Sequence, residues 1–286
     1  MKVLQYRATS SMNLKTFLYD KGISKKSLSA IKQNGALLVN KEHATVRKDI
    51  HEGDEIEVHL PNESPSHNLE PFTFDLNILF EDEWFIIVSK PAMMNTAPSR
   101  EHPHHSLVEA VLSHMVMNGE RTIPHIVTRL DRGTSGIVIF AKHQLLHHMV
   151  SNTTISKYYV ALVHGVVAPK KGVIKAPIAR AKHSIIEREV SEEGKFAHTE
   201  YEYLDGNSKN SMLKLQLFTG RTHQIRVHLA HIGYPIIGDS LYGYEDVQYD
   251  HQLLQCKHIE FIHPITLKQL HIVDEMHYNL SGVGMI

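Results

Sequence analysis

The pattern of apolar positions near the start of the chain is helical. Leu14, Phe17 and Leu18 recur at the spacing of one helix face, which predicts a first helix there. Ser24 is suited to cap a second helix, whose apolar side chains again fall on one face, and Gly35 ends it. The sequence therefore predicts two short helices in succession.

Short strands follow these helices. The apolar run 36–39 and the alternating stretch 55–60 have the pattern of strands, with Asn40-Lys41 and Gly53-Asp54 as turns. We therefore predict a small N-terminal α/β module over residues 1–60. Residues 61–72 contain three prolines and few apolar positions, which predicts an extended linker.

From residue 73 onward the pattern is dominated by strands. Stretches that predict strands lie at 78–80, 85–88, 136–140, 158–163, 197–204 and 212–218. Helical spacing occurs at 106–117, 144–151 and 222–232. Because the strands often follow one another without a helical crossover, we predict an α+β domain over residues 73–286. Its core should be a large, mostly antiparallel mixed sheet flanked by helices.

Composition narrows the class of protein. The chain has 286 residues, of which 42% are hydrophobic and 21% charged, as is usual for a folded protein with a core. The single cysteine, Cys256, excludes an intramolecular disulfide and a zinc site built on several thiolates, and it favours a reducing compartment. No apolar stretch has the length of a signal-peptide core or a membrane span. We expect a cytosolic (cytoplasmic) protein without membrane contact, and a monomer.

The charge pattern shows one local basic block. The formal net charge is −1, so any binding of a polyanion must use local patches. The first 33 residues hold seven basic side chains, including Lys25, Lys26 and Lys32, against the single acid Asp20. Such a block is often only a solvated helix face, and binding of a polyanion is the alternative.

The strongest chemical signal is the polar segment 129–136, which leads directly into an apolar strand. Arg129 and Arg132 stand within two residues of Asp131 and favour its ionised form, which suits a nucleophile or a base. Thr134 is suited to cap or orient the loop. A surface salt bridge at the entry to a strand is the alternative interpretation.

A second segment, 220–231, carries further candidates. Thr222 is suited to cap its helix, and Arg226 sits beside the apolar stripe, from where it can reach inward to a buried carboxylate. Arg221 and His223, at the start of the helix, are well placed to meet phosphate. An amphipathic helix with a solvated basic face would have the same periodicity.

The third candidate is Tyr159 in the predicted strand 158–163. It shares one strand face with Ala161 and Val163, so its ring can form the floor of a cleft and stack on an extruded base. Tyrosines in strands are also common core residues, and the spacing does not separate the two roles.

These segments, in this order, resemble the RluA/RluD-type pseudouridine synthases. The resemblance rests on Arg-Leu-Asp followed by Thr-Ser-Gly at 129–136 and on Gly-Arg-Thr-His-Gln-Ile-Arg at 220–226, and it spans nearly the whole chain. The phrases 24–26, 35–40 and 53–56 are similar to the S-four RNA-binding module, although a generic helical cap on the next domain is the alternative. The implied organisation is an S-four-like domain at 1–60, a linker at 61–72 and a catalytic domain at 73–286.

The resemblance implies roles for four residues. Asp131 matches the family's catalytic aspartate, Arg226 the arginine that pairs with it, Tyr159 the tyrosine that packs on the target base, and Arg129 the arginine that replaces the extruded nucleotide. Together with the charge pattern, it leads us to assign eight side chains to RNA binding: Arg129, Arg132, Thr134, Arg221, His223, Lys25, Lys26 and Lys32.

The resemblance also implies a reaction. Members break the N-glycosidic bond of a uridine in RNA, turn the uracil and rejoin it through carbon 5, without a cofactor or a metal. Large-subunit ribosomal RNA is the favoured target and transfer RNA the alternative. A noncatalytic RNA-binding or ribosome-assembly factor on the same fold is the alternative from another functional class. A carbohydrate hydrolase is the least favoured alternative, because it would need two cooperating carboxylates and the loop offers one.

Two positions depart from the family pattern. Thr128 stands where a histidine usually precedes Arg-Leu-Asp, and Met93 stands where glycine commonly follows Lys-Pro-Ala, so that turn must differ or be strained.

One group of histidines raises the alternative of a metal site. His102, His104 and His105 lie in a proline-containing loop without the spacing of a metal-ligand set, so we predict no metal site there.

Overall fold

The computed structural model describes residues 2–64, 69–244 and 248–275, so part of the predicted linker (65–68) lies outside the described residues. The described helices all fall within or close to the segments that the apolar pattern predicted. They are α1 (Leu14–Asp20), α2 (Lys25–Asn34), α3 (Leu107–Met117), α4 (Gln144–Ser151) and α5 (Gln224–His231). Within these ranges, no helix is both long enough and apolar enough to cross a bilayer.

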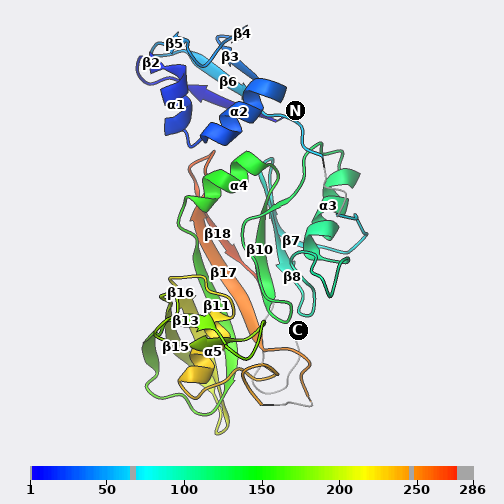
Figure 1. The fold of residues 1–286 in the computed structure, drawn as a ribbon, viewed down its shortest axis with the longest axis vertical. Helices are drawn as coiled ribbons and strands as arrows, with labels where there is room; N and C mark the ends of the chain where they lie inside the picture. The colour runs from blue at the N-terminus through cyan, green and yellow to red at the C-terminus, as the bar shows by residue number, and fades with distance from the viewer. Residues whose placement is uncertain (1, 65–68, 245–247, 276–286) are drawn as a thin grey trace.

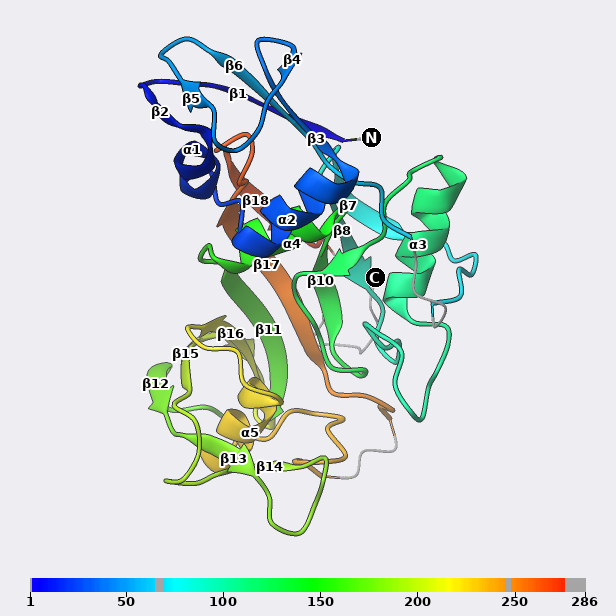
Figure 2. The ribbon, with the colours of Figure 1, turned by 45° about the horizontal axis from the view of Figure 1, so that its top comes forward.

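Residues 2–60, which we call the N-terminal module, form the blue lobe of Figure 1. The predicted helices and strands of this module are present. Its main sheet has the order β1-β6-β3-β4, and β2 pairs with β5. The bounds are β1 (Val3–Arg7), β2 (Met12–Asn13), β3 (Ala36–Val39), β4 (Glu42–His43), β5 (Asp49–Ile50) and β6 (Glu55–His59). Figures 1 and 2 show α1 and α2 on the side of the module that faces α4.

Local chemistry explains where α2 begins and ends. The Ser24 hydroxyl accepts a hydrogen bond from the backbone N–H of Ser27 at 3.1 Å, which satisfies one of the free donors of the first turn. At the other end, a Cβ on Gly35 would lie 2.2 Å from the carbonyl oxygen of His59. Only glycine lets the chain pass this close to β6, so the helix stops there.

The rest of the chain forms a 10-stranded mixed sheet in the order β12-β15-β16-β11-β17-β10-β8-β7, with β18 on β17 and β9 on β10. Only β10 and β17 pair in parallel within this sheet as described, and the other pairs are antiparallel. The predicted α+β class with a mostly antiparallel mixed sheet is confirmed. The strands are β7 (Asn77–Glu81), β8 (Phe85–Lys90), β9 (His125–Ile126), β10 (Ser135–Ala141), β11 (Ser156–His164), β12 (Lys171–Lys175), β15 (His198–Gly206), β16 (Asn210–Leu217), β17 (Leu254–Ile262) and β18 (Gln269–Val273), and β13 (Ile178–Arg180) pairs separately with β14 (Arg188–Val190).

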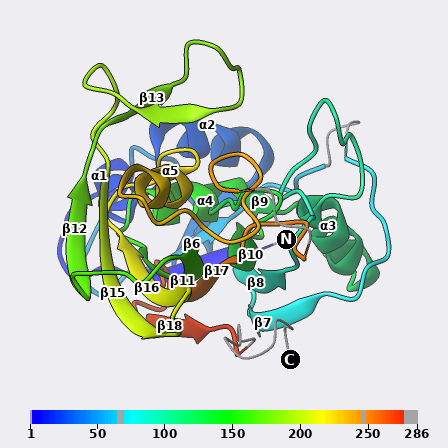
Figure 3. The same cartoon turned by 90° about the horizontal axis from the view of Figure 1, so that it is seen from below.

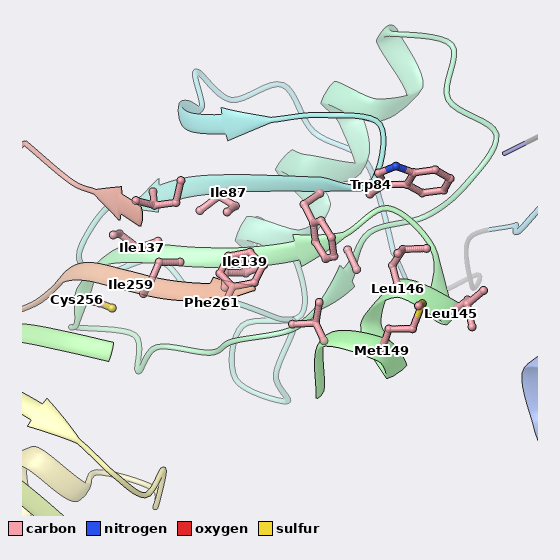
Figure 4. Packing of buried hydrophobic residues seen from close by; sticks show 14 of the residues in the cluster. Trp84, Ile87, Ile137, Ile139, Leu145, Leu146, Met149, Cys256, Ile259 and Phe261 are labelled. Atoms are coloured by element: carbon pink, nitrogen blue, oxygen red, sulfur yellow. The ribbon is translucent and has the colours of Figure 1, made fainter. Parts of the chain in front are cut away.

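Helices cover both faces of the sheet at β8 and β10. Ile137 and Ile139 of β10 belong to the same buried cluster as Leu146 and Met149 of α4, as Figure 4 shows. The alternate side chains of β10 face the other way and pack in a second cluster with α3. A strand buried on both faces needs an uninterrupted apolar run, which is why residues 137–140 contain no polar side chain.

The helix α5 packs on the face formed by β11 and β16. Its Ile225 and Leu229 join the cluster that contains Tyr159 and Ala161 of β11. The opposite side of α5 packs through Val227 toward the β13–β14 pair, and Figure 3 shows the helix between this pair and the sheet. Among the polar side chains of α5, Arg226 reaches the loop before β10, whereas Gln224 and His228 make hydrogen bonds with Thr199 of β15.

One glycine fixes the position of the segment before β10. Gly136 has a φ of +103°, and a Cβ there would lie 2.3 Å from the carbonyl oxygen of Cys256 in β17. This is where β10 and β17 meet in parallel. The close approach requires glycine, and it holds the preceding loop, which contains Asp131, at the junction of the two strands.

The two departures from the family pattern have different structural consequences. The Thr128 hydroxyl accepts a hydrogen bond from the backbone N–H of Ile139 at 3.0 Å, so this side chain ties the approach to the Asp131 loop onto β10. Met93 has a φ of +65°, in the left-handed region that costs a residue with a Cβ roughly 1–2 kcal/mol. The expectation of a strained turn is therefore confirmed.

This strain predicts the effect of a single substitution. We expect Met93→Gly to raise the free energy of unfolding by about 0.5–1 kcal/mol, because the relieved strain exceeds the entropy cost of a glycine. Ala92→Gly is the matched control: Ala92 does not have a positive φ, so glycine there should lower the free energy of unfolding by a similar amount. Urea unfolding curves measure both, and a loss of stability in Met93→Gly would contradict the strain.

Candidate active site

A cleft of about 530 Å³ opens between the Asp131 loop and the start of α5. Eight of the eleven predicted site residues line it. They are Asp131, Tyr159, Arg226, Arg129, Arg132, Thr134, Arg221 and His223. The fold therefore gathers the three sequence segments that carried candidate chemistry into one place.

Asp131 presents a partly open carboxylate to this cleft. Its side chain is 33% exposed, and its Oδ2 lies 3.5 Å from Nη1 of Arg226 and 3.8 Å from Nε2 of His223. The backbone of its loop is fixed, since the N–H of Thr134 donates to the Asp131 carbonyl oxygen at 3.0 Å. The carboxylate is thus held in position while it remains accessible to a substrate.

The guanidinium of Arg226 connects two carboxylates. Its Nε and Nη2 donate to the two carboxylate oxygens of Asp239 at 2.7 and 2.8 Å, while its Nη1 points to Asp131. Burial by itself lowers the pKa of Arg226, but the contact with Asp239 outweighs burial and raises it. Arg226 therefore stays charged, and Asp239 fixes its orientation.

Asp239 is the site residue that the sequence reasoning missed. The expectation that Arg226 reaches a buried carboxylate is confirmed, but the carboxylate in closest contact is Asp239, which is 1% exposed, and not Asp131. Asp239 also accepts hydrogen bonds from the backbone N–H groups of Leu241 and Tyr242. The sequence signal that pointed to it was slight: an acid directly after the turn at Gly238, whose φ is +75°.

The start of α5 differs from the prediction. The residue that caps the helix is His223, in the left-handed conformation with a φ of 57°, and not Thr222. This turn places the His223 ring in the cleft, where its Nδ1 lies 2.8 Å from the hydroxyl of Tyr242. Burial lowers the pKa of His223, while the Asp131 carboxylate opposes that shift, and the imidazole is neutral at neutral pH.

Tyr159 forms a buried wall of the cleft. Its side chain is 6% exposed, and burial raises the pKa of its phenol well above the ordinary value, so the phenol stays protonated. A flat, neutral ring beside a carboxylate is suited to pack against a nucleobase.

Lys90 is a second residue whose role the sequence did not reveal. Its side chain is fully buried, and its Nζ donates to the carbonyl oxygens of Pro91, Met94 and Arg132. Burial lowers the pKa of Lys90 to about 7, although the nearby Asp131 carboxylate acts in the opposite direction. Lys90 thus ties the strained turn at Met93 to the Asp131 loop.

The remaining predicted residues lie at the rim or elsewhere. Arg129, Arg132 and Arg221 are exposed around the cleft. The cation that pairs with Asp131 is Arg226 of α5, and not an arginine next to Asp131 in sequence. Thr134 is 2% exposed and its hydroxyl accepts a hydrogen bond from Gln252, so it fixes the loop from below. Three further residues lie on α2 and do not line the cleft: Lys25, Lys26 and Lys32.

Among the described residues, the group of side chains suited to a metal ion lies away from the cleft. In the described part of the chain, one group of side chains could hold a metal ion, and it consists of His258, Glu260 and His271 on β17 and β18. None of the three lines the cleft. His104, from the histidine-containing loop, instead lies 3.5 and 3.6 Å from the carboxylates of Glu70 and Glu109.

The pairing of Arg226 with Asp239 predicts a stability effect. Asp239→Asn should lower the free energy of unfolding by about 3 kcal/mol, because a buried guanidinium loses its charged partner. Glu202→Gln, which removes an exposed ion pair with Lys171, is the control and should change stability by less than about 0.5 kcal/mol. Urea unfolding followed by circular dichroism measures both values, and equal effects of the two substitutions would contradict the role given to Asp239.

Comparison with known proteins relates this arrangement to one family. The pattern of the family described as RNA pseudouridylate synthase matches residues 84–231. The chain is 40% identical over 264 residues to Uncharacterized RNA pseudouridine synthase YjbO of Bacillus subtilis, which covers 91% of this chain and 93% of that protein. It is 34% identical to Ribosomal large subunit pseudouridine synthase D of Zymomonas mobilis, over 77% of this chain and 74% of that one.

A solved structure shares the fold. The human protein RNA Pseudouridylate Synthase Domain Containing 1 superposes with a TM-score of 0.59 at 19% sequence identity, over 77% of this chain and 89% of that chain. At this identity the likeness concerns the architecture, and it agrees with the mixed sheet described above.

Proposed function

Because this chain belongs to the RNA pseudouridylate synthase family, and is therefore an isomerase that converts uridine in RNA to pseudouridine, we propose that its target is a uridine of large-subunit ribosomal RNA. One relative, 74% of whose length this chain covers, is named Ribosomal large subunit pseudouridine synthase D. A structured RNA of that kind also suits a chain that carries a basic module beside its catalytic sheet.

The observation that carries the catalytic assignment is the shared guanidinium of Arg226. Asp239 accepts hydrogen bonds from Nε and Nη2, and Nη1 faces the open carboxylate of Asp131. A cation held in this way keeps Asp131 oriented without covering it, so the carboxylate can meet the nucleotide whose N-glycosidic bond breaks.

The other cleft residues have roles that follow from their chemistry. A uridine must leave its stack to reach a carboxylate in a cleft. The ring of Tyr159 provides a flat surface for the extruded uracil, and the exposed guanidinium of Arg129 can occupy the space that the nucleotide leaves in the RNA. Arg132 and Arg221, at the rim, are placed to meet phosphates on either side.

The N-terminal module provides a second contact with RNA in this proposal. Lys25 and Lys32 on α2 line a separate cleft of about 410 Å³ together with Lys15, Arg47 and Tyr19. Lys26 is exposed beside them. Because the chain as a whole carries a net charge of −1, such a local basic surface is the means by which it can attract the phosphate backbone.

The catalytic assignment predicts a separation of activity from binding. We expect Asp131→Asn to abolish pseudouridine formation and to leave RNA affinity nearly unchanged, because affinity comes mainly from Lys and Arg contacts with phosphate. Carbodiimide labelling and primer extension, on RNA from cells that carry the wild-type gene, the variant or no gene, locate the modified uridine.

The same experiment identifies the target. Asp250→Asn serves as the control, because that carboxylate is 80% exposed and does not line the cleft, and full modification is expected. The proposed target would be contradicted if the primer-extension stop that depends on the gene appeared in transfer RNA and not in large-subunit ribosomal RNA. Equal modification by wild type and Asp131→Asn would contradict the catalytic assignment.

The basic surface of α2 predicts a change in salt dependence. Replacing Lys25, Lys26 and Lys32 by Gln should weaken binding to ribosomal RNA and reduce the slope of log K against log salt by roughly 1 for each lysine that meets a phosphate. A matched triple replacement of three exposed lysines outside both clefts, Lys170, Lys171 and Lys268, is the control. Filter binding over a salt series distinguishes the two sets, and identical slopes would contradict RNA binding by the module.

A further inference from the structure

Two phenylalanine rings are exposed near residues that line the active cleft. Phe196 precedes β15 and Phe218 follows β16, and their side chains are 54% and 50% exposed. Three sequence neighbours of Phe218 line the cleft: Leu217, Gly220 and Arg221. Large rings left in water next to a functional cleft usually mark a surface that another molecule covers.

A histidine supports these rings from beneath. His198 stacks on Phe218 with 4.4 Å between ring centroids and 15° between ring planes, and Phe196 approaches the same histidine at 6.4 Å. His198 thus covers one face of Phe218, while half of the Phe218 side chain stays open to solvent. The three residues form a ready surface on which a further flat ring can stack.

Gln224 of α5 holds this surface in a fixed position relative to the catalytic residues. Its Nε2 donates to the carbonyl oxygen of His198 at 3.0 Å, and its Oε1 accepts from the Thr219 hydroxyl at 2.8 Å. The N–H of Phe218 donates to that same His198 carbonyl. Gln224 is 3% exposed and lies two residues before Arg226, so the helix that carries the arginine is also hydrogen-bonded to the strand that carries His198.

A cation lies beside the rings. The Nε of Arg221 donates to the carbonyl oxygen of Phe196 at 2.9 Å, and Arg221 is exposed and lines the cleft. Lys195, the neighbour of Phe196, is also exposed. A flat apolar surface next to positive charge matches the two parts of a nucleotide, a base and a phosphate.

We propose that Phe196, His198 and Phe218 form a stacking platform that binds one unpaired base of the RNA substrate next to the target uridine, while Arg221 binds a neighbouring phosphate. This inference rests on the proposed function, because it concerns the RNA that enters the same cleft. Every base has a π face, so the platform selects for an unstacked nucleotide and is tolerant of its sequence. It would hold the strand while the uridine is extruded.

Affinity for a short single strand tests the platform apart from catalysis. The probe is a fluorescein-labelled RNA of twelve uridines, and its Kd is measured by fluorescence anisotropy. We expect Phe218→Ala to raise the Kd roughly 5- to 150-fold, the range for loss of one base stack, and Phe218→Trp to restore it. Phe74→Ala, which removes an exposed ring outside the cleft, should leave the Kd unchanged.

A series of abasic probes then tests whether the ring binds a base. In this series the probe carries a single uridine among cytidines, so that the uridine in the cleft sets the register of the strand. With one abasic nucleotide moved along this strand, wild type should lose affinity at one position, and Phe218→Ala should show no additional loss there. An unchanged Kd for Phe218→Ala, or additive losses at every abasic position, would overturn the platform. Asp131→Asn should bind the probe like wild type, so a failure of the catalytic assignment appears in modification assays and a failure of the platform appears in the Kd.

Discussion

The structure depends on how one guanidinium is divided between two carboxylates. An arginine presents five N–H donors in a rigid fork, and a buried carboxylate accepts two of them side by side. Asp239 makes this bidentate contact with Arg226, which leaves Nη1 for Asp131 at 3.5 Å. The short contacts fix the cation, and the longer one leaves the second carboxylate open to a substrate.

This contact joins parts of the fold that are far apart in sequence. Arg226 lies on α5, which packs on β11 and β16, whereas Asp131 lies in the loop before β10. The parallel meeting of β10 and β17 at Gly136, together with the carbonyl contacts of Lys90, sets the loop at the end of the sheet that α5 faces. The cleft is therefore a consequence of sheet topology, and the aromatic surface beside it belongs to the same rigid frame through Gln224.

The fold and the gathering of Asp131 and Arg226 in one cleft could be predicted from sequence because each has a local signal. Continuous or alternating apolar runs gave the strands of the large sheet, and Asp131 and Arg226 stand in long polar phrases between them. Asp239 stands in the phrase Gly238-Asp239 before Leu241-Tyr242-Gly243, but nothing local assigns it a role, because that role depends on a partner that only the tertiary structure brings near. The N-cap of α5 differs from the predicted Thr222 for a related reason: threonine is a good N-cap by residue type, but the Gln224 side chain accepts a hydrogen bond from the N–H of Arg221, and His223 occupies the N-cap position. Lys90 was overlooked because a lysine at the end of a strand usually reaches water, and here three carbonyl oxygens converge on it.

The most direct test of the shared guanidinium is a double-mutant cycle on the rate of pseudouridine formation in a single turnover. Arg226→Lys removes the fork and Asp239→Asn removes the charge that orients it. If both act through the one contact with Asp131, each slows the chemical step at unchanged RNA affinity, and the double variant is hardly slower than the single ones. Rates that fall by the product of the two separate effects would show that Asp239 does not act through Arg226 and would contradict this account.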